Sequence, residues 1–207
     1  MPSILFATPC YGGQVFAPHF KSCMALTQDL TINGIEHDWL IRWNESLVHR
    51  ARMGMTAEFL KTNHTHMMWL DADIEFTSDD VAKLWNLDVD IAVGAYRMKK
   101  EGGGLAAWKD GEMLRHLDTL EGAQSVDYAG TGFMMIKREV IEVLAELAPK
   151  FDNEHKDIPA LYMTPIVNGV LESEDYHFCR IAREAGYKIT LDPSIRLGHW
   201  GLKRFEA

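Results

Sequence analysis

The chain has 207 residues, of which 47% are hydrophobic and 25% charged, the balance of an ordinary soluble protein with a single domain. Its formal net charge of -9 argues against general coating of nucleic acid, although it leaves room for a local basic pocket that binds a diphosphate. Three cysteines without paired spacing, no signal sequence and no apolar stretch of roughly 18 residues together predict a soluble cytoplasmic protein.

The first half of the chain alternates apolar strands with helices. Strands are predicted over residues 4–8, 35–43 and 89–95, and a fourth lies within the apolar stretch 67–76 that contains two aspartates. Helices are predicted from Ala17 to the Asn33-Gly34 stop, over 47–61, and over 79–86 behind a Thr77 cap. This order predicts an α/β fold with a mostly parallel sheet flanked by helices.

The second half is less regular. Residues 99–104 are predicted to be a mobile loop, and 105–128 to form short antiparallel strands, a small sub-sheet beside the main one. A strand over 133–136 and a helix over 137–147 follow, and then 150–171 without a clear period, which is typical of a substrate-binding lid. A helix over 173–184, short strands over 188–191 and 195–197, and a basic tail complete the chain.

Asp71 and Asp73 end the apolar stretch and are one residue apart. In an extended chain, residues i and i+2 lie on the same side, so both carboxylates are expected to face one divalent ion. Capping or loop acids at a strand end are the simpler explanation of an isolated Asp-x-Asp. Thr8, Trp43 and Asp71 all stand at predicted carboxyl ends of strands, where ligands bind in such sheets, and this favours a metal-binding crevice.

Histidines and arginines extend this hypothesis. His199, in a glycine-flanked turn, is the best candidate for a third metal ligand, whereas His64 and His66 are interpreted as strand residues that face solvent or a helix. Arginine near such a crevice suits phosphate oxygens. Arg50 and Arg52 are two apart on a helix and cannot point the same way, so only Arg52 is predicted to contact a ligand.

Glu174 and Asp175 follow Ser173 at the start of a predicted helix. Acids at this position are commonly explained by the helix dipole. The functional alternative is a general base that takes a proton from an attacking hydroxyl. Spacing alone does not choose between the two.

Taken together, the motifs resemble those of a small GT-A-fold glycosyltransferase, nearly from end to end. The resemblance rests on Thr8-Pro9-Cys10-Tyr11, Ser46 to Arg52, Leu70-Asp71-Ala72-Asp73-Ile74, Gly130-Thr131-Gly132-Phe133-Met134, Ser173-Glu174-Asp175-Tyr176 and His199. Short members without a membrane anchor, from phages, giant viruses and bacteria, are the most similar. One departure is Met53, which stands where such sequences commonly have Asn.

The resemblance implies a metal-dependent transferase that moves a sugar from a nucleotide-sugar, a UDP-sugar, with Mn²⁺ or Mg²⁺. It implies donor contacts from residues 1–98, with acceptor binding and catalysis from 99–207. The implied metal ligands are Asp71, Asp73 and His199, and Asp175 is the base if the enzyme inverts, with Glu174 orienting the acceptor. The implied donor-binding residues are Thr8, Pro9, Tyr11, Arg42, Arg52, Asp71 and Lys203, and the implied acceptor-binding residues are Gly130, Thr131, Gly132 and Glu174.

Three alternatives compete with this hypothesis. A phosphatase of the Asp-x-Asp type is rejected, because its motif belongs on the first strand and Glu75 occupies the place of its Thr or Val. A nucleotide-sugar-binding module without turnover stays open. So does an acceptor in nucleic acid, such as a modified DNA base, for which a local basic patch is available from Lys99, Lys100, Lys137 and Arg138.

Overall fold

A computed structural model describes residues 3–153, 155–201 and 203–206. Its α-helices are α1 (Ala17–Ile32), α2 (Val48–Phe59), α3 (Ser78–Asn86), α4 (Arg138–Leu147) and α5 (Glu174–Glu184), with 3-10 turns η1 (Tyr11–Gly13) and η2 (Leu117–Thr119). The strands of the main sheet are β1 (Ser3–Cys10), β2 (Glu36–Trp43), β3 (His66–Leu70), β5 (Ile91–Val93), β8 (Gln124–Val126), β10 (Phe133–Lys137) and β15 (Ile189–Leu191).

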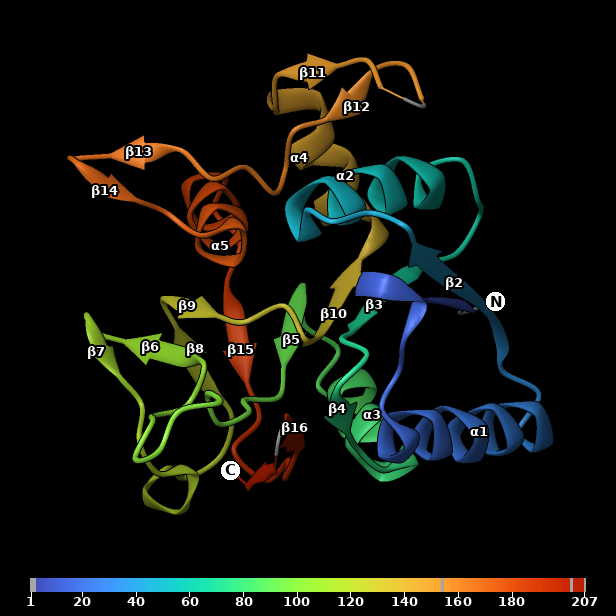
Figure 1. Cartoon of the computed structure of the whole chain (residues 1–207), viewed down its shortest axis with the longest axis vertical. Coiled ribbons are helices and arrows are strands. Elements are labelled where there is room, and N and C mark those ends of the chain that lie inside the picture. Colours follow the sequence, from blue (N-terminus) through green and yellow to red (C-terminus); the bar gives the residue numbers. More distant parts are fainter. Residues whose placement is uncertain (1–2, 154, 202, 207) are drawn as a thin grey trace.

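The main sheet has the strand order β2-β1-β3-β10-β5-β15-β8. Five strands run parallel, while β10 is antiparallel to both β3 and β5, and β8 is antiparallel to β15. The prediction of an α/β fold with a mostly parallel sheet is confirmed. Figure 1 shows β2 at one side of the molecule and the short strands β6 to β9 at the other.

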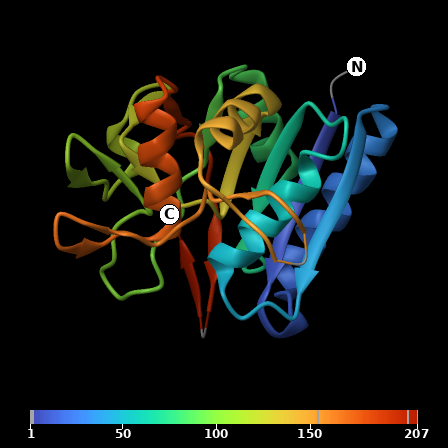
Figure 2. The ribbon, with the colours of Figure 1, turned by 90° about the horizontal axis from the view of Figure 1, so that it is seen from above.

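Helices cover both faces of the sheet and create two apolar cores. Alternation along β3 sends Met67 and Trp69 to the core under α2, α4 and α5, and Met68 and Leu70 to the core over α1 and α3. All four of these side chains are fully buried. The two layers of helices are visible on opposite sides of the strands in Figure 1, and from above in Figure 2. A strand buried on both faces explains why this stretch is apolar without interruption.

Small antiparallel sheets surround the main one. They are β17-β16-β4 (Arg204–Glu206, Gly198–Trp200, Ile74–Glu75), β7-β6-β9 (Glu112–Met113, Ala107–Lys109, Tyr128–Ala129), β11-β12 (Lys150–Phe151, Ile158–Pro159) and β13-β14 (Ile166–Val167, Val170–Leu171). The first joins the end of the chain to the segment directly after Asp73, because His199 pairs with Ile74. None of the helices in the described part of the chain is long and apolar enough to cross a bilayer.

Two predictions about elements were wrong. No strand forms at 195–197, because Ile195 and Leu197 are buried in the core instead of pairing with a neighbour, and the strand that follows β15 lies at Gly198–Trp200. Residues 150–171 were expected to lack regular structure, but they contain the hairpins β11-β12 and β13-β14. The second hairpin turns at Asn168-Gly169, where both residues have a positive φ.

Candidate active site

The two aspartates lie on a turn between the main sheet and β4. The Ile74 N–H donates to the Asp71 carbonyl at 3.0 Å, so the segment is not extended as predicted. Three other segments hold this turn through their backbones. The Asp71 N–H donates to the Gly132 carbonyl, the Phe16 N–H donates to the Ala72 carbonyl, and the Trp200 N–H donates to the Asp73 carbonyl. The turn directs the two carboxylates toward different partners.

Asp71 is held by Arg52. The Arg52 Nη2 donates to Asp71 Oδ1 at 2.8 Å, and its Nε lies 3.7 Å from Glu174 Oε1. The Arg52 side chain is only 3% exposed and rests over the Trp69 ring, 5.1 Å from the ring centroid. The pKa of Arg52 is raised: burial opposes its charge, but Asp71 and Glu174 outweigh burial. Arg52 therefore bridges the end of β3 and the start of α5.

Asp73 faces a second set of partners. Lys99 forms an ion pair with Asp73 Oδ2, and His199 Nε2 lies 3.5 Å from Asp73 Oδ1. Burial alone would raise the pKa of Asp73, but His199 and Lys99 together hold it below its usual value. Asp73 is therefore a carboxylate at neutral pH, in a partly buried place where a cation would be stabilised.

The donor set of Asp73 and His199 fits a divalent metal ion. His199 Nδ1 lies 2.8 Å from the Arg97 carbonyl and therefore carries a proton, which leaves Nε2, on the side of Asp73, as the nitrogen that could bind a cation. Asp73 Oδ1 is buried and has no hydrogen-bond partner within the described chain. A carboxylate oxygen and an imidazole lone pair that face each other suit a shared cation. Asp71, the other predicted ligand, pairs with Arg52 here, and no group of three or more His, Cys, Asp or Glu side chains suited to a metal ion occurs among the described residues.

Tyr96 lies between His199 and the segment that contains Gly132. It is 8% exposed, its ring contacts His199 edge to face with centroids 4.9 Å apart, and its hydroxyl accepts from the Gly132 N–H at 3.1 Å. Burial raises the pKa of Tyr96 far above its ordinary value, helped by Asp71 and Asp175, so the hydroxyl stays protonated. Tyr96 was not predicted as a site residue, although its position just beyond the carboxyl end of β5 is a signal that the sequence carries.

The Gly130-Thr131-Gly132 segment closes around the Tyr96 hydroxyl. A Cβ added at Gly130 would lie 2.3 Å from the Tyr96 oxygen, and one at Gly132 would lie 2.8 Å from both that oxygen and Asp71 Oδ2. All three residues are buried, and Thr131 is 1% exposed. The structure thus places these three predicted acceptor-binding residues beneath the site, where they position Tyr96 and Asp71.

Glu174 and Asp175 begin α5, as predicted, and lie on the far side of Arg52 from the turn. Burial raises the pKa of Glu174, although the nearby Arg52 cation opposes the change. Asp175 Oδ1 accepts hydrogen bonds from the Ser173 hydroxyl and from the Tyr176 N–H, the latter at 2.8 Å. Asp175 is half-buried, so its remaining oxygen is the one with a route to a substrate.

A crevice of about 340 Å³ opens beside the aspartate turn. It is lined by Pro9, Tyr11, Gln14, Phe16, Val48, Asp71, Ala72 and Asp73. Of the predicted donor-binding residues, Pro9, Tyr11 and Asp71 are brought together here. Tyr11 is 77% exposed, so its ring is available to cover a flat group such as a nucleobase.

Other predicted donor-binding residues lie elsewhere. The Thr8 side chain is 2% exposed and lines a separate pocket beneath α1, so only its backbone is near the crevice. Arg42 forms an ion pair with Glu58 of α2. Lys203 is on the exposed turn between β16 and β17, where it pairs with Glu101 at 3.3 Å. Both of these cations already have a carboxylate partner.

The structure also shows where the other arginine and histidine residues considered in the sequence lie. Arg50 is 43% exposed and pairs with Glu45, whereas Arg52 is buried, so the two do point apart. His66 faces a helix, as predicted, with its ring 4.6 Å from that of Trp85 in α3. His64 is 6% exposed and contacts Asp38 at 3.0 Å instead of facing solvent or a helix.

Comparisons with known proteins support the fold. No family model matches the chain, and no curated protein is similar to it at a significant level. Among solved structures, A197 from STIV matches over 97% of this chain and 86% of its own, with 21% identity and a TM-score of 0.61. GalNAc-T7, solved with UDP, GalNAc and Mn²⁺, matches over 96% of this chain at 12% identity and a TM-score of 0.54. This chain corresponds to only 43% of the GalNAc-T7 chain. The chain has the α/β GT-A fold.

Proposed function

We propose that this protein is a metal-dependent glycosyltransferase that moves a sugar from a nucleotide-sugar, a UDP-sugar, to an acceptor hydroxyl. The observation that carries the proposal is the pair of Asp73 Oδ1 and His199 Nε2, 3.5 Å apart, in which Asp73 also lines the crevice. A nucleotide diphosphate leaves with additional negative charge, and Mn²⁺ or Mg²⁺ held by this pair would stabilise that charge.

Residues of this chain would bind the donor on both sides of the turn. Pro9 and Tyr11 line the crevice and would contact the base and ribose. Asp71, fixed by its hydrogen bond from Arg52, lines the same crevice and would accept hydrogen bonds from the ribose hydroxyls. Lys99, which pairs with Asp73 in this structure, would contribute its ammonium group to binding the diphosphate.

The acids at the start of α5 would act on the acceptor. If the reaction inverts the sugar, Asp175 removes the proton from the acceptor hydroxyl, and Glu174 orients that hydroxyl. Arg52 connects Glu174 to Asp71, so the donor side and the acceptor side share one buried cation. If the reaction retains configuration, the same two acids position the acceptor.

The experiment combines metal and nucleotide binding with turnover. UDP plus Mn²⁺ is expected to raise the melting temperature more than the sum of the two alone, because bound ligands stabilise the folded state. Asp73→Asn should remove the Mn²⁺ increment and donor hydrolysis while leaving the fold intact. The matched control is Asp79→Asn, which neutralises a 74%-exposed acid in α3 and should change neither.

The outcomes separate a transferase from the alternatives. Mn²⁺-dependent UDP binding without hydrolysis or transfer to any acceptor would indicate a nucleotide-sugar-binding module. Full turnover in Asp73→Asn would refute the assigned metal site. A retained UDP shift in Asp175→Asn, with transfer lost, is the result expected for an inverting enzyme.

A further inference from the structure

We propose that the edge strand β2 is an interface between two copies of this chain, paired antiparallel about Leu40. Within the described chain, β2 is hydrogen-bonded to β1 on one side only, so the backbone groups on its other side have no strand partner. Figure 2 shows β2 at the rim of the molecule. An uncovered strand of eight residues is a template for pairing, and it contains no proline to prevent it.

The two faces of β2 differ in chemistry. Trp39, Ile41 and Trp43 face α1, whereas Asp38, Leu40 and Arg42 face α2. On the α1 face, Ile41 is 47% exposed and Trp43 is 60% exposed. Exposed apolar side chains beside an unpaired edge are the usual mark of an interaction surface. A partner that pairs with this edge has to suit both faces at once.

The order of residues along β2 is self-complementary. With two copies antiparallel and Leu40 opposite Leu40, Asp38 of each copy lies opposite Arg42 of the other. On the other face the same register places Trp39 opposite Ile41, again twice. A dimer with a two-fold axis requires a surface that is complementary to itself. On one face of β2 the apolar Trp39 and Ile41 meet, and on the other the acidic Asp38 and the basic Arg42 stand on either side of Leu40. A parallel arrangement would instead place Asp38 against Asp38.

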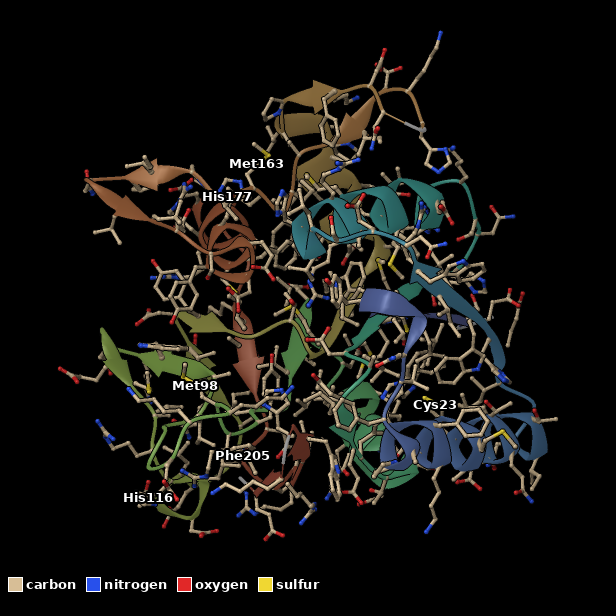
Figure 3. The ribbon with its side chains drawn as sticks, viewed as in Figure 1. Cys23, Met98, His116, Met163, His177 and Phe205 are labelled. Carbon is tan, nitrogen blue, oxygen red and sulfur yellow. The ribbon has the colours of Figure 1, made fainter. Side chains whose placement is uncertain are left out.

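The neighbouring helix would extend the contact. Phe20 and Met24 of α1 are 57% and 58% exposed and line the same pocket as Ile41 and Trp43, a pocket of about 420 Å³ between α1 and β2. Figure 3 shows Cys23, another lining residue, on the side of α1 that faces the sheet. A strand added to β2 would run along the outer side of this pocket, so the partner's Trp39 and Ile41 would cover it.

The charged residues of β2 also favour a second copy of this chain as the partner. Asp38 has a 73%-exposed side chain whose contact in the chain is His64, so it can accept a second cation. Arg42 already pairs with Glu58, and it remains 21% exposed at the edge. A guanidinium has five N–H donors, and so it can serve Glu58 and a partner's carboxylate together.

Reciprocal charge exchange tests the proposal on the full-length protein. Sedimentation velocity over a range of concentrations should show the wild type in equilibrium with a species of twice the 23.5 kDa chain mass. Asp38→Arg alone and Arg42→Asp alone should each raise the dimer dissociation constant by about tenfold or more, because two like-charged pairs form per dimer. The double exchange, Asp38→Arg with Arg42→Asp, should restore dimerisation. Glu146→Arg, which changes the net charge by the same amount as Asp38→Arg at an exposed position on α4, is the control for that variant and should leave dimerisation unchanged.

Two results would overturn the proposal. One is a wild-type protein that remains monomeric at the highest concentration reached. The other is a dimer that neither single exchange weakens, which would place the contact away from β2. Amide hydrogen exchange provides a check without any variant: the outward N–H groups of β2 should become more protected as the wild-type concentration rises.

Discussion

Arg52 is a charged residue almost wholly removed from water, and its two acidic partners come from distant parts of the chain. Replacing it with Met would keep the volume over Trp69 but leave Asp71 and Glu174 without their shared cation. Breaking a buried ion pair from one side costs about 3–5 kcal/mol. We therefore expect Arg52→Met to lower the free energy of unfolding by about that amount in urea titrations.

The control for this prediction is two residues away on the same helix. Arg50→Met removes a partly exposed pair with Glu45, and such pairs contribute about 0–1 kcal/mol. Equal losses in the two variants would mean that Arg52 contributes no more than an exposed arginine, which would contradict the role assigned to it.

The raised pKa of Glu174 makes the stability of the folded protein depend on pH in a predictable direction. Burial raises its pKa above the ordinary value of 4.5, so between these two values the folded state binds more protons than the unfolded state. The contribution of Glu174 to stability is therefore present below pH 4.5 and is lost as the pH rises through its folded pKa. Relative to Glu174→Gln, the wild type should become less stable from pH 4 to pH 7 in parallel denaturation series. A difference that stays flat or grows over this range would contradict the shift.

At the scale of elements, the loop before β10 can lie close to Tyr96 only because its residues 130 and 132 are glycines. A methyl group at Gly130 would meet the Tyr96 oxygen at 2.3 Å, so Gly130→Ala should lower the free energy of unfolding by about 1–3 kcal/mol. The same variant should reduce turnover, because moving Tyr96 disturbs its contact with His199. Thermal denaturation and donor hydrolysis measure the two effects.

Gly54 provides the matched substitution within α2. A Cβ there lies 3.6 Å from Arg42 Nη2, an ordinary contact, and the residue is inside a helix. Gly54→Ala should therefore stabilise the protein by about 0.5–1 kcal/mol. Should both alanine variants destabilise equally, steric conflict at Tyr96 would not be the cause.

Most regular elements were predictable because their apolar periods are clear, as in β1, β2, β3 and β5 and the helices α1, α2 and α3 between them. The aspartate turn was not, since an apolar run such as 67–76 carries no mark of where the strand leaves the sheet. The β13-β14 hairpin did have a local signal in Asn168-Gly169, flanked by Val167 and Val170. At Ile195 and Leu197 a local signal was misleading. The alternation of apolar residues predicted a strand, but these two side chains alternate because both are buried in the core of an irregular segment.

At the scale of the whole molecule, the net charge argues against binding to nucleic acid. Lys99, Lys137 and Arg138 of the suggested basic patch pair with Asp73, Asp88 and Glu142, respectively. With a formal net charge of -9, the protein should give no mobility shift with double-stranded DNA even at low salt. A shift that weakens steeply with added salt would contradict this and favour an acceptor in DNA.

The sequence singled out Asp71, Asp73, Arg52 and His199 but not how these side chains pair in the candidate site. Asp73 with His199 and Arg52 with Asp71 are contacts across the fold, and no local pattern encodes which carboxylate meets which cation. Tyr96 and Lys99 were not singled out as site residues, because their roles depend on the segments that pack around them. The Thr8 side chain lies apart from the crevice because the side chains of β1 alternate between the two faces of the sheet and that of Thr8 lines the pocket beside α1.

The pairing of β16 with β4 has a consequence for biosynthesis. His199 and the N–H that holds the Asp73 carbonyl both come from β16, about 125 residues after the turn they complete. During translation, the aspartate turn leaves the ribosome long before these partners exist. The first seventy residues can form the β1-β2-β3 sheet early, but the cation-binding pair assembles only when the last strands emerge. A nascent or shortened chain that ends before β16 would thus contain the residues that line the crevice but lack His199 and the Trp200 N–H that holds the aspartate turn.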